Sequence, residues 1–186
     1  PTIELKKETK KEDWYIGDIY HLSIGQGDLT VTPLQMAIAT AAIANNGVLW
    51  RPQIVDKIID SEKNIIKEFA PQAIRKINEP LSVLAPSDSL RSAYIKKENF
   101  KIIQDAMRLT VTAGSAQSLK TLSVKVAGKT GTAQVNGDKK SDAWFTAFAP
   151  YENPTIVLTI LVENGGEGSI IAVPIAKNVL EWYFNK

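Results

Sequence analysis

The sequence predicts an α+β fold in which helices flank an antiparallel sheet. Three strand-like segments follow one another closely, at residues 124–135, 143–149 and 155–163. Turn-forming residues at 136–138 and 150–154 separate them, and such short connections favour an antiparallel meander. Segments with helical periodicity precede and follow this meander, an arrangement typical of the α+β class.

The first helix predicted from the pattern follows Thr32 and Pro33 and ends near Asn46 and Gly47. Threonine is a favourable N-cap, proline suits the first helical position, and an Asn-Gly pair suits a helix end. Its small side chains predict close packing of one face against another element. That face carries Leu34, Ile38, Ala41 and Ala42.

A β-hairpin is predicted next, because the strand-like segments 55–60 and 64–69 meet at the turn-forming residues 61–64. Prolines and serines then interrupt residues 70–92, which predicts a connecting stretch with short pieces of structure. Two further helices are expected, one ending near Gly114 and one beginning at Pro174. Their predicted apolar stripes are Phe100, Ile103, Met107 and Val111 in the first, and Ile175, Val179, Trp182 and Tyr183 in the second.

Composition limits the function classes. The chain has 186 residues, 44% of them apolar, which suits a single domain with a real core. Its 22 basic and 20 acidic residues leave a net charge of +2, too small for a nucleic-acid-binding protein, and the Lys-rich opening reads as a solvated face. With no cysteine, disulfides and thiolate metal sites are excluded.

No apolar run approaches the ~20 residues of a membrane span, so we expect a soluble chain. Because it starts at Pro1, we expect that any targeting segment has been left out.

The segment around Lys129 has two opposing interpretations. Gly128-Lys129-Thr130 resembles the end of a phosphate-binding loop, but such a loop needs a glycine where this chain has Ser123, and a helix afterwards. The sequence instead predicts a strand that runs into a turn. A strand with an exposed lysine and no further role is the alternative if the segment is taken alone.

An accessible strand here would place the Lys129 ammonium near the hydroxyls of Thr130 and Thr132. Gly131 would let a substrate backbone approach closely. Charge-assisted hydrogen bonds of this kind contribute about 1.5 to 3 kcal/mol each, enough to orient a carboxylate. Backbone N–H groups of the same strand could stabilise an oxyanion.

Four separated segments decide between the interpretations. They are SIGQGDLTVTPLQMA at 23–37, VAGKTGTAQV at 126–135, AWFTAFAPYENP at 143–154 and LVENGGEG at 161–168. In order and spacing they resemble the C-terminal half of a class B penicillin-binding protein of the cell-elongation type. The resemblance covers nearly the whole chain and implies that residues 1–186 are the C-terminal portion of one penicillin-binding/β-lactamase-like transpeptidase domain.

The resemblance implies a D,D-transpeptidase that cross-links peptidoglycan stem peptides through a serine acyl-enzyme, which β-lactams also form. By motif, Lys129 and Thr132 are catalytic: Lys129 supplies positive potential and organises proton transfer, and the Thr132 N–H belongs to the oxyanion hole. Thr130 and Thr132 bind the substrate carboxylate beside Lys129, and Gly131 permits close approach. No metal or cofactor is implied. An elongation glycan polymerase is the implied partner, on the extracytoplasmic side of the membrane that anchors the parent protein.

Two motifs of the family are absent. No serine is followed three residues later by lysine, and no Ser-x-Asn element occurs. The nucleophile needs that lysine one helical turn away as a proton acceptor. We therefore expect this chain to be inactive alone. We also expect it to associate with itself or with another chain, such as the missing N-terminal part of its domain, or to have rearranged so that the uncovered apolar face is buried. A β-lactamase or β-lactam-sensor domain and a non-catalytic interaction module of cell-wall assembly stay open as alternatives.

Single residues add minor expectations. His21, the only histidine, lies beside the strand-like LSI and is expected to be a surface or packing residue. Gly25 and Gly27 are expected to serve chain geometry. Asp142 and Trp144 could form the rim of the substrate groove, although a core position is expected for Trp144.

Overall fold

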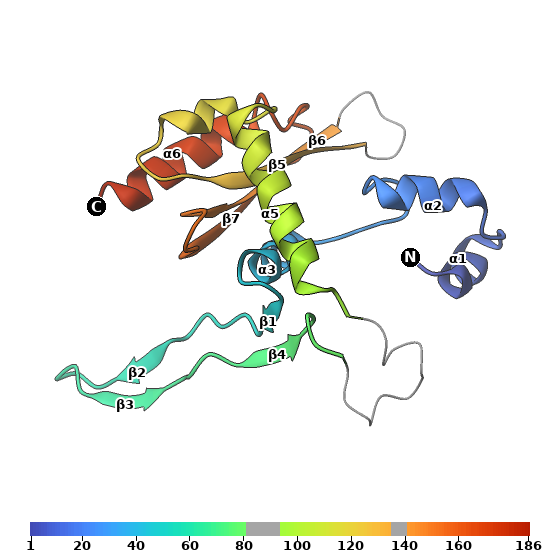
Figure 1. Ribbon diagram of the computed structural model, residues 1–186. Helices are drawn as coiled ribbons and strands as arrows, with labels where there is room; N and C mark the ends of the chain where they lie inside the picture. Colours follow the sequence, from blue (N-terminus) through green and yellow to red (C-terminus); the bar gives the residue numbers. More distant parts are fainter. Residues whose placement is uncertain (81–93, 135–140) are drawn as a thin grey trace.

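A three-stranded antiparallel sheet forms the centre of the molecule in the computed structural model, which describes residues 1–80, 94–134 and 141–186 (Figure 1). Its strands, in spatial order, are β5 (Ala127–Gln134), β6 (Ser141–Ala149) and β7 (Ile156–Val162). The predicted α+β class and all three predicted strands are confirmed. The predicted turn at 136–138 lies outside the described residues.

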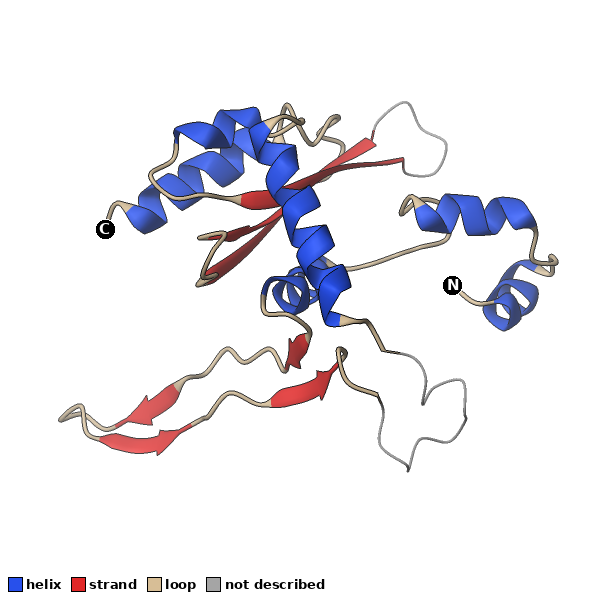
Figure 2. Cartoon of the chain, viewed as in Figure 1, coloured by secondary structure: helices blue, strands red, loops and turns tan. Residues whose placement is uncertain are grey.

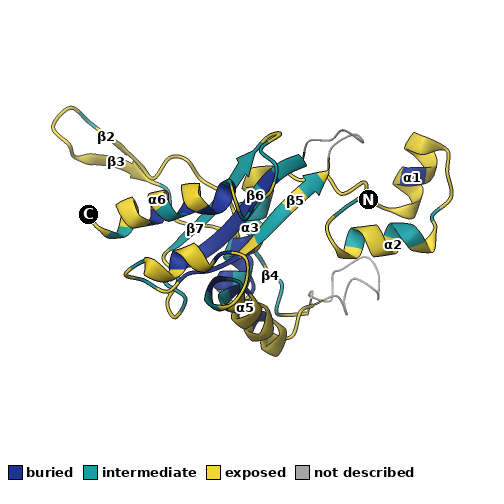
Figure 3. Cartoon of the chain, turned by 90° about the horizontal axis from the view of Figure 1, so that it is seen from above, coloured by how far each residue is buried: buried dark blue, intermediate teal, exposed yellow. Residues whose placement is uncertain are grey.

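Helices cover both faces of this sheet (Figure 3). On one face α6 (Ala172–Phe184) and the 3₁₀ helix η1 (Gln117–Thr121) enclose the larger core. On the other face α3 (Pro33–Ala44) and α5 (Lys97–Thr112) enclose a smaller one. Helix α5 contributes Met107 to this smaller core and Val111 to the larger one. Strand β6 lies between the two cores and is buried from Phe145 to Ala149. The larger core includes Val111, Leu119, Val126, Phe145, Val173 and Leu180.

Helix α3 begins as predicted, because the Thr32 side chain and Gln35 form a reciprocal capping box. Buried hydroxyls join the helix to the sheet: Thr40 and Thr146 lie 2.8 Å apart, and Thr146 and Thr159 lie 2.9 Å apart. The close packing is confirmed, but the predicted face is partly wrong. Leu34 is 56% exposed, whereas Ala42 and Ala44 are buried with Thr40.

The last helix begins at Ala172, two residues before the predicted start, and its buried face differs from the predicted one. Ala172, Val173, Ala176 and Leu180 pack on the sheet, while the predicted stripe of Ile175, Val179, Trp182 and Tyr183 is exposed. Both sets have helical spacing, and the set with two alanines allows the closer approach. In α5 the buried residues Phe100, Met107 and Val111 were predicted, but Ile103 is 46% exposed.

A long two-stranded ribbon extends away from the body (Figure 2). Its base pairs β1 (Val48–Trp50) with β4 (Ala73–Lys76), and its outer half pairs β2 (Lys57–Ile59) with β3 (Ile65–Glu68). The predicted hairpin is confirmed. The short structure expected within residues 70–92 includes β4, and residues 81–93 lie outside the described part.

Two short helices form the N-terminal unit, α1 (Ile3–Lys10) and α2 (Ile16–Ser23). The Lys-rich opening is mostly exposed, as expected, but Lys6 is buried and bonds both oxygens of Asp18. The LSI segment is not strand-like, because it forms the last turn of α2. Within the described ranges, no helix combines the length and apolar content needed to cross a bilayer.

Candidate active site

Residues 129–132 lie in β5, the strand at one edge of the sheet. Lys129 pairs with Thr146 of β6, Gly131 with Trp144, and the register is regular along the whole strand. The segment is therefore extended on both sides of Lys129. This excludes a phosphate-binding loop, which requires a glycine turn leading into a helix.

The side chains of β5 alternate between the two faces of the sheet. Thr130 and Thr132 point to the α6 face, where the Thr130 hydroxyl lies 2.8 Å from Ser115 Oγ and the Gly168 N–H donates to Thr132 Oγ1 over 3.4 Å. The Lys129 side chain points to the opposite face, that of α3, and its Nζ donates to the Thr130 carbonyl at 2.5 Å. The two hydroxyls thus share one face of the sheet, whereas the ammonium lies at the strand edge, on the Thr130 carbonyl.

The outer edge of β5 carries carbonyl groups that other side chains satisfy. Lys129 donates to Thr130 O, and Gln26 Nε2 donates to Thr132 O at 3.0 Å. Just before the strand, Arg108 donates to Val126 O at 2.7 Å. The N–H and C=O of one residue in an antiparallel strand point to the same side. The N–H groups of Thr130 and Thr132 consequently face outward as well, where an extended ligand or an oxyanion could accept from them.

The sequence did not predict that a second glycine, Gly168, lets another segment pack closely against the site. A Cβ on Gly168 would overlap the carbonyl oxygens of both Gly131 and Trp144. The loop before α6 therefore lies directly on the β5–β6 pair and delivers its N–H to Thr132. The glycine-rich LVENGGEG segment was the available signal. Ser115, which follows α5, had no signal of its own in the sequence.

The rim residues differ from expectation in one respect. Trp144 is half-buried beside Gly131 and belongs to neither core cluster, so the expected core position is wrong. Asp142 faces Ala133 and accepts from the Asn164 N–H at 2.8 Å, which fixes the loop after β7.

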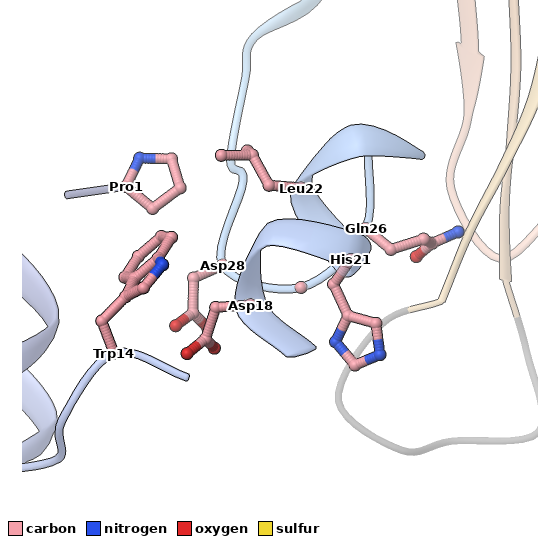
Figure 4. A pocket seen from close by; sticks show the side chains of 8 residues that line it. Pro1, Trp14, Asp18, His21, Leu22, Gln26 and Asp28 are labelled. Atoms are coloured by element: carbon pink, nitrogen blue, oxygen red, sulfur yellow. The ribbon is translucent and has the colours of Figure 1, made fainter. Parts of the chain in front are cut away.

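A small pocket lies between the N-terminal helices and the turn after α2 (Figure 4). Trp14, Asp18 and Asp28 line one side of it, and the Gln26 side chain extends from the other side toward the sheet. His21 is exposed, in agreement with the expected surface position. Gly25 and Gly27 have φ values of 74° and 75°, which confirms their role in chain geometry. Among the described residues, no group of three His, Cys, Asp or Glu side chains could hold a metal ion.

Residues 2–181 match the family model described as the penicillin binding protein transpeptidase domain, and the chain belongs to this family. It is 33% identical, over its whole length, to the peptidoglycan D,D-transpeptidase MrdA of Haemophilus influenzae, of which it covers 29%.

Solved structures of the family superpose well on the fold. Penicillin-binding protein PBP2 of Pseudomonas aeruginosa in complex with WCK 5153 gives a TM-score of 0.72 at 30% identity, over 98% of this chain and 37% of that one. The imipenem acyl-enzyme of penicillin-binding protein A from M. tuberculosis gives 0.71 at 28% identity, over 88% of this chain and 33% of that one. The chain thus spans about a third of these proteins.

Proposed function

We propose that this chain is the substrate-binding C-terminal portion of a peptidoglycan D,D-transpeptidase domain. The outer edge of β5 carries the proposal, because its outward N–H groups and the Lys129 ammonium lie on the same short strand segment as the two threonine hydroxyls of the α6 face. A relative named as a peptidoglycan D,D-transpeptidase matches over the full chain and supports the same reaction.

Each group of the strand edge has a distinct role in this proposal. The C-terminal carboxylate of a stem peptide accepts hydrogen bonds from Thr130 and Thr132, and Lys129 supplies the positive charge that selects an anion. The Thr132 N–H donates to the carbonyl oxygen that becomes negative in the tetrahedral intermediate. Gly131 leaves the strand open to the substrate backbone.

The reaction itself needs a nucleophile from outside these 186 residues, since no S-x-x-K is present. The serine oxygen bonds to the penultimate D-alanine carbonyl carbon, and the bond to the terminal D-alanine nitrogen breaks. Lys129 assists the transfer of the serine proton toward that nitrogen. The amine of a second stem peptide then attacks the ester and releases the serine.

Apolar surface beside Lys129 supports a missing neighbour. Trp144 and Leu161 oppose each other on the α3 face of the sheet, and neither is fully buried. Leu34, in the first turn of α3, is 56% exposed. A helix that brings the nucleophile to Lys129 would cover apolar surface of this kind, at about 25 cal/mol per Å². Without it, we expect the chain to self-associate.

Labelled penicillin tests the proposal. The chain alone should form no covalent adduct, whereas a polypeptide that joins it to a family S-x-x-K portion should form one per molecule. Lys129→Met in that polypeptide should slow acylation about a hundredfold, by loss of electrostatic stabilisation.

Lys125→Met is the matched control, because Lys125 is an exposed lysine of the same segment that pairs with Glu152 away from the site. An adduct on a serine of the isolated chain, or acylation that survives Lys129→Met, would overturn the proposal. Rapid hydrolysis of the adduct would indicate a β-lactamase, and no adduct in the longer polypeptide would indicate an interaction module.

A further inference from the structure

The turn that follows α2 holds one residue, Gln26, in a defined position. The Gln26 N–H donates to His21 O at 2.9 Å, and the Gly25 N–H donates to Leu22 O at 3.0 Å. With Gly25 at a φ of 74°, these two bonds form a Schellman motif. The residue at the Gln26 position of this motif commonly packs an apolar side chain back on the helix. Here it is an amide that points away from α2 (Figure 4).

The Gln26 amide reaches across 106 residues of sequence to the edge of β5. Its Nε2 donates to the Thr132 carbonyl at 3.0 Å, and Gln26 itself is half-buried. Because a carbonyl oxygen has two lone pairs, this bond leaves Thr132 able to accept from a ligand as well. The bond joins the N-terminal helical unit to the strand edge that bears the proposed oxyanion donor.

We propose that Gln26 is a positioning residue for the β5 edge, an inference that rests on the proposed function. Thr132 lies two residues before the end of β5, where pairing with β6 restrains only the inner side of the strand. The Gln26 bond restrains the outer side at the same residue. The bond limits rotation about the Thr132 backbone. It therefore holds the Thr132 N–H, the proposed oxyanion donor, in the direction that an oxyanion requires.

The first test needs only this chain. Ala133 N–H and Thr132 C=O belong to one peptide group, so loss of the Gln26 bond should shift the Ala133 amide resonance in ¹⁵N NMR spectra. Gln26→Ala and Gln26→Glu should both shift it at neutral pH. A protonated carboxyl can donate as the amide does, so the Gln26→Glu spectrum should return toward that of the parent as pH falls below about 4.3.

Gln53→Ala is the matched control for this experiment. Gln53 also donates from Nε2 to a backbone carbonyl, that of Ala70 at 3.3 Å, but it does so on the distant ribbon. Its replacement should leave the Ala133 resonance unchanged. An Ala133 resonance that is insensitive to Gln26→Ala would overturn the proposal at once, because the bond would then place no restraint on the strand.

The second test uses acylation by labelled penicillin in the polypeptide that carries the S-x-x-K portion. Gln26→Ala should lower the acylation rate constant about fivefold, the effect of one hydrogen bond, with a smaller change in affinity for the unreacted drug. In acid, the acylation rate constant of Gln26→Glu should recover part of its loss relative to the parent.

Faster acylation or tighter binding in Gln26→Ala would overturn the proposal, since the amide would then be a competitor of the substrate. An unchanged rate would also overturn it, while the Lys129→Met result would still decide the proposed function separately.

Discussion

The sheet and the two projecting parts of the molecule are stabilised by different interactions. In β6 every residue from Phe145 to Ala149 is buried between two layers of helices. In contrast, α2 has no buried residue and all of β2 and β3 is exposed (Figure 3). Caps, turns and charged pairs hold these outer parts. The difference indicates that the sheet supplies the stability of the strand that carries the candidate site. The outer parts can change without unfolding the sheet, although Gln26 of the N-terminal unit contacts the β5 edge.

Glycine replacement gives the largest expected contrast between the two regions. Gly168→Ala should lower the free energy of unfolding by about 3 kcal/mol or more, because the new Cβ would overlap two backbone carbonyl oxygens. Urea denaturation followed by circular dichroism measures the change.

Gly17→Ala is the control in the N-terminal unit. A Cβ on Gly17 meets no atom within 4 Å, and alanine favours the helix, so stability should stay equal or rise by less than about 1 kcal/mol. Equal losses in the two variants would show that the contrast between the regions is wrong.

Helix α6 allows the same comparison within one element. Leu180 is fully buried, and Leu180→Ala should cost about 2 to 5 kcal/mol of unfolding free energy. Trp182 is 61% exposed and its ring contacts Lys186 Nζ, so Trp182→Ala should cost about 1 kcal/mol or less. If Trp182→Ala lowered the free energy of unfolding more than Leu180→Ala, the face predicted from the sequence would be the packed one after all.

The elements of the sheet could be predicted because local signals agreed. Turn residues separated three β-prone segments, and Thr32 with Pro33 defined the start of α3. The buried face of α6 could not be predicted from the sequence, because two sets of apolar residues in this helix have the same helical spacing. Only contact with the sheet selects the set that contains the small residues. Helix α2 was missed because its N-cap is Tyr15, which makes no side-chain cap hydrogen bond in the way that a serine or threonine would. Only the Asp18 carboxylate caps this end, by accepting from the Tyr15 N–H at 2.7 Å.

For the candidate site, the sequence predicted Lys129, Thr130 and Thr132 but not their surroundings. Strand alternation separates the Lys129 side chain from the two hydroxyls, a consequence of assigning the segment to a strand. Ser115 and Gln26 reach the strand from 15 and 106 residues away. Such contacts depend on tertiary packing, and no local pattern specifies them.

Acid should loosen the N-terminal unit before the sheet. The Lys6 ammonium donates to both Asp18 oxygens and holds the pKa of Asp18 below its ordinary value of 3.8. A lowered folded-state pKa gives stability that is present above 3.8 and lost as pH falls through the lowered value. The Trp14 indole resonance, beside Asp18, should therefore change in acid while Phe145 resonances do not.

Asp18→Asn should remove this acid dependence, because asparagine does not titrate. High salt should weaken the pair in the parent chain, although Lys6 is largely shielded from water. A Trp14 resonance that follows the same acid transition as Phe145 would mean that the N-terminal unit and the sheet unfold together.

The ribbon should give the smallest effect of all. Ile66 lies in β3 and is 66% exposed, and threonine keeps the β-branched shape that suits a strand. Ile66→Thr should therefore change the unfolding free energy by less than about 0.5 kcal/mol, as is usual for surface positions. Phe148→Leu in β6 is the buried counterpart and should cost more, since it leaves a gap in a filled core. If Ile66→Thr were the more damaging change, the ribbon would have to pack against another molecule in solution, and the contrast between a packed sheet and a free ribbon would fail.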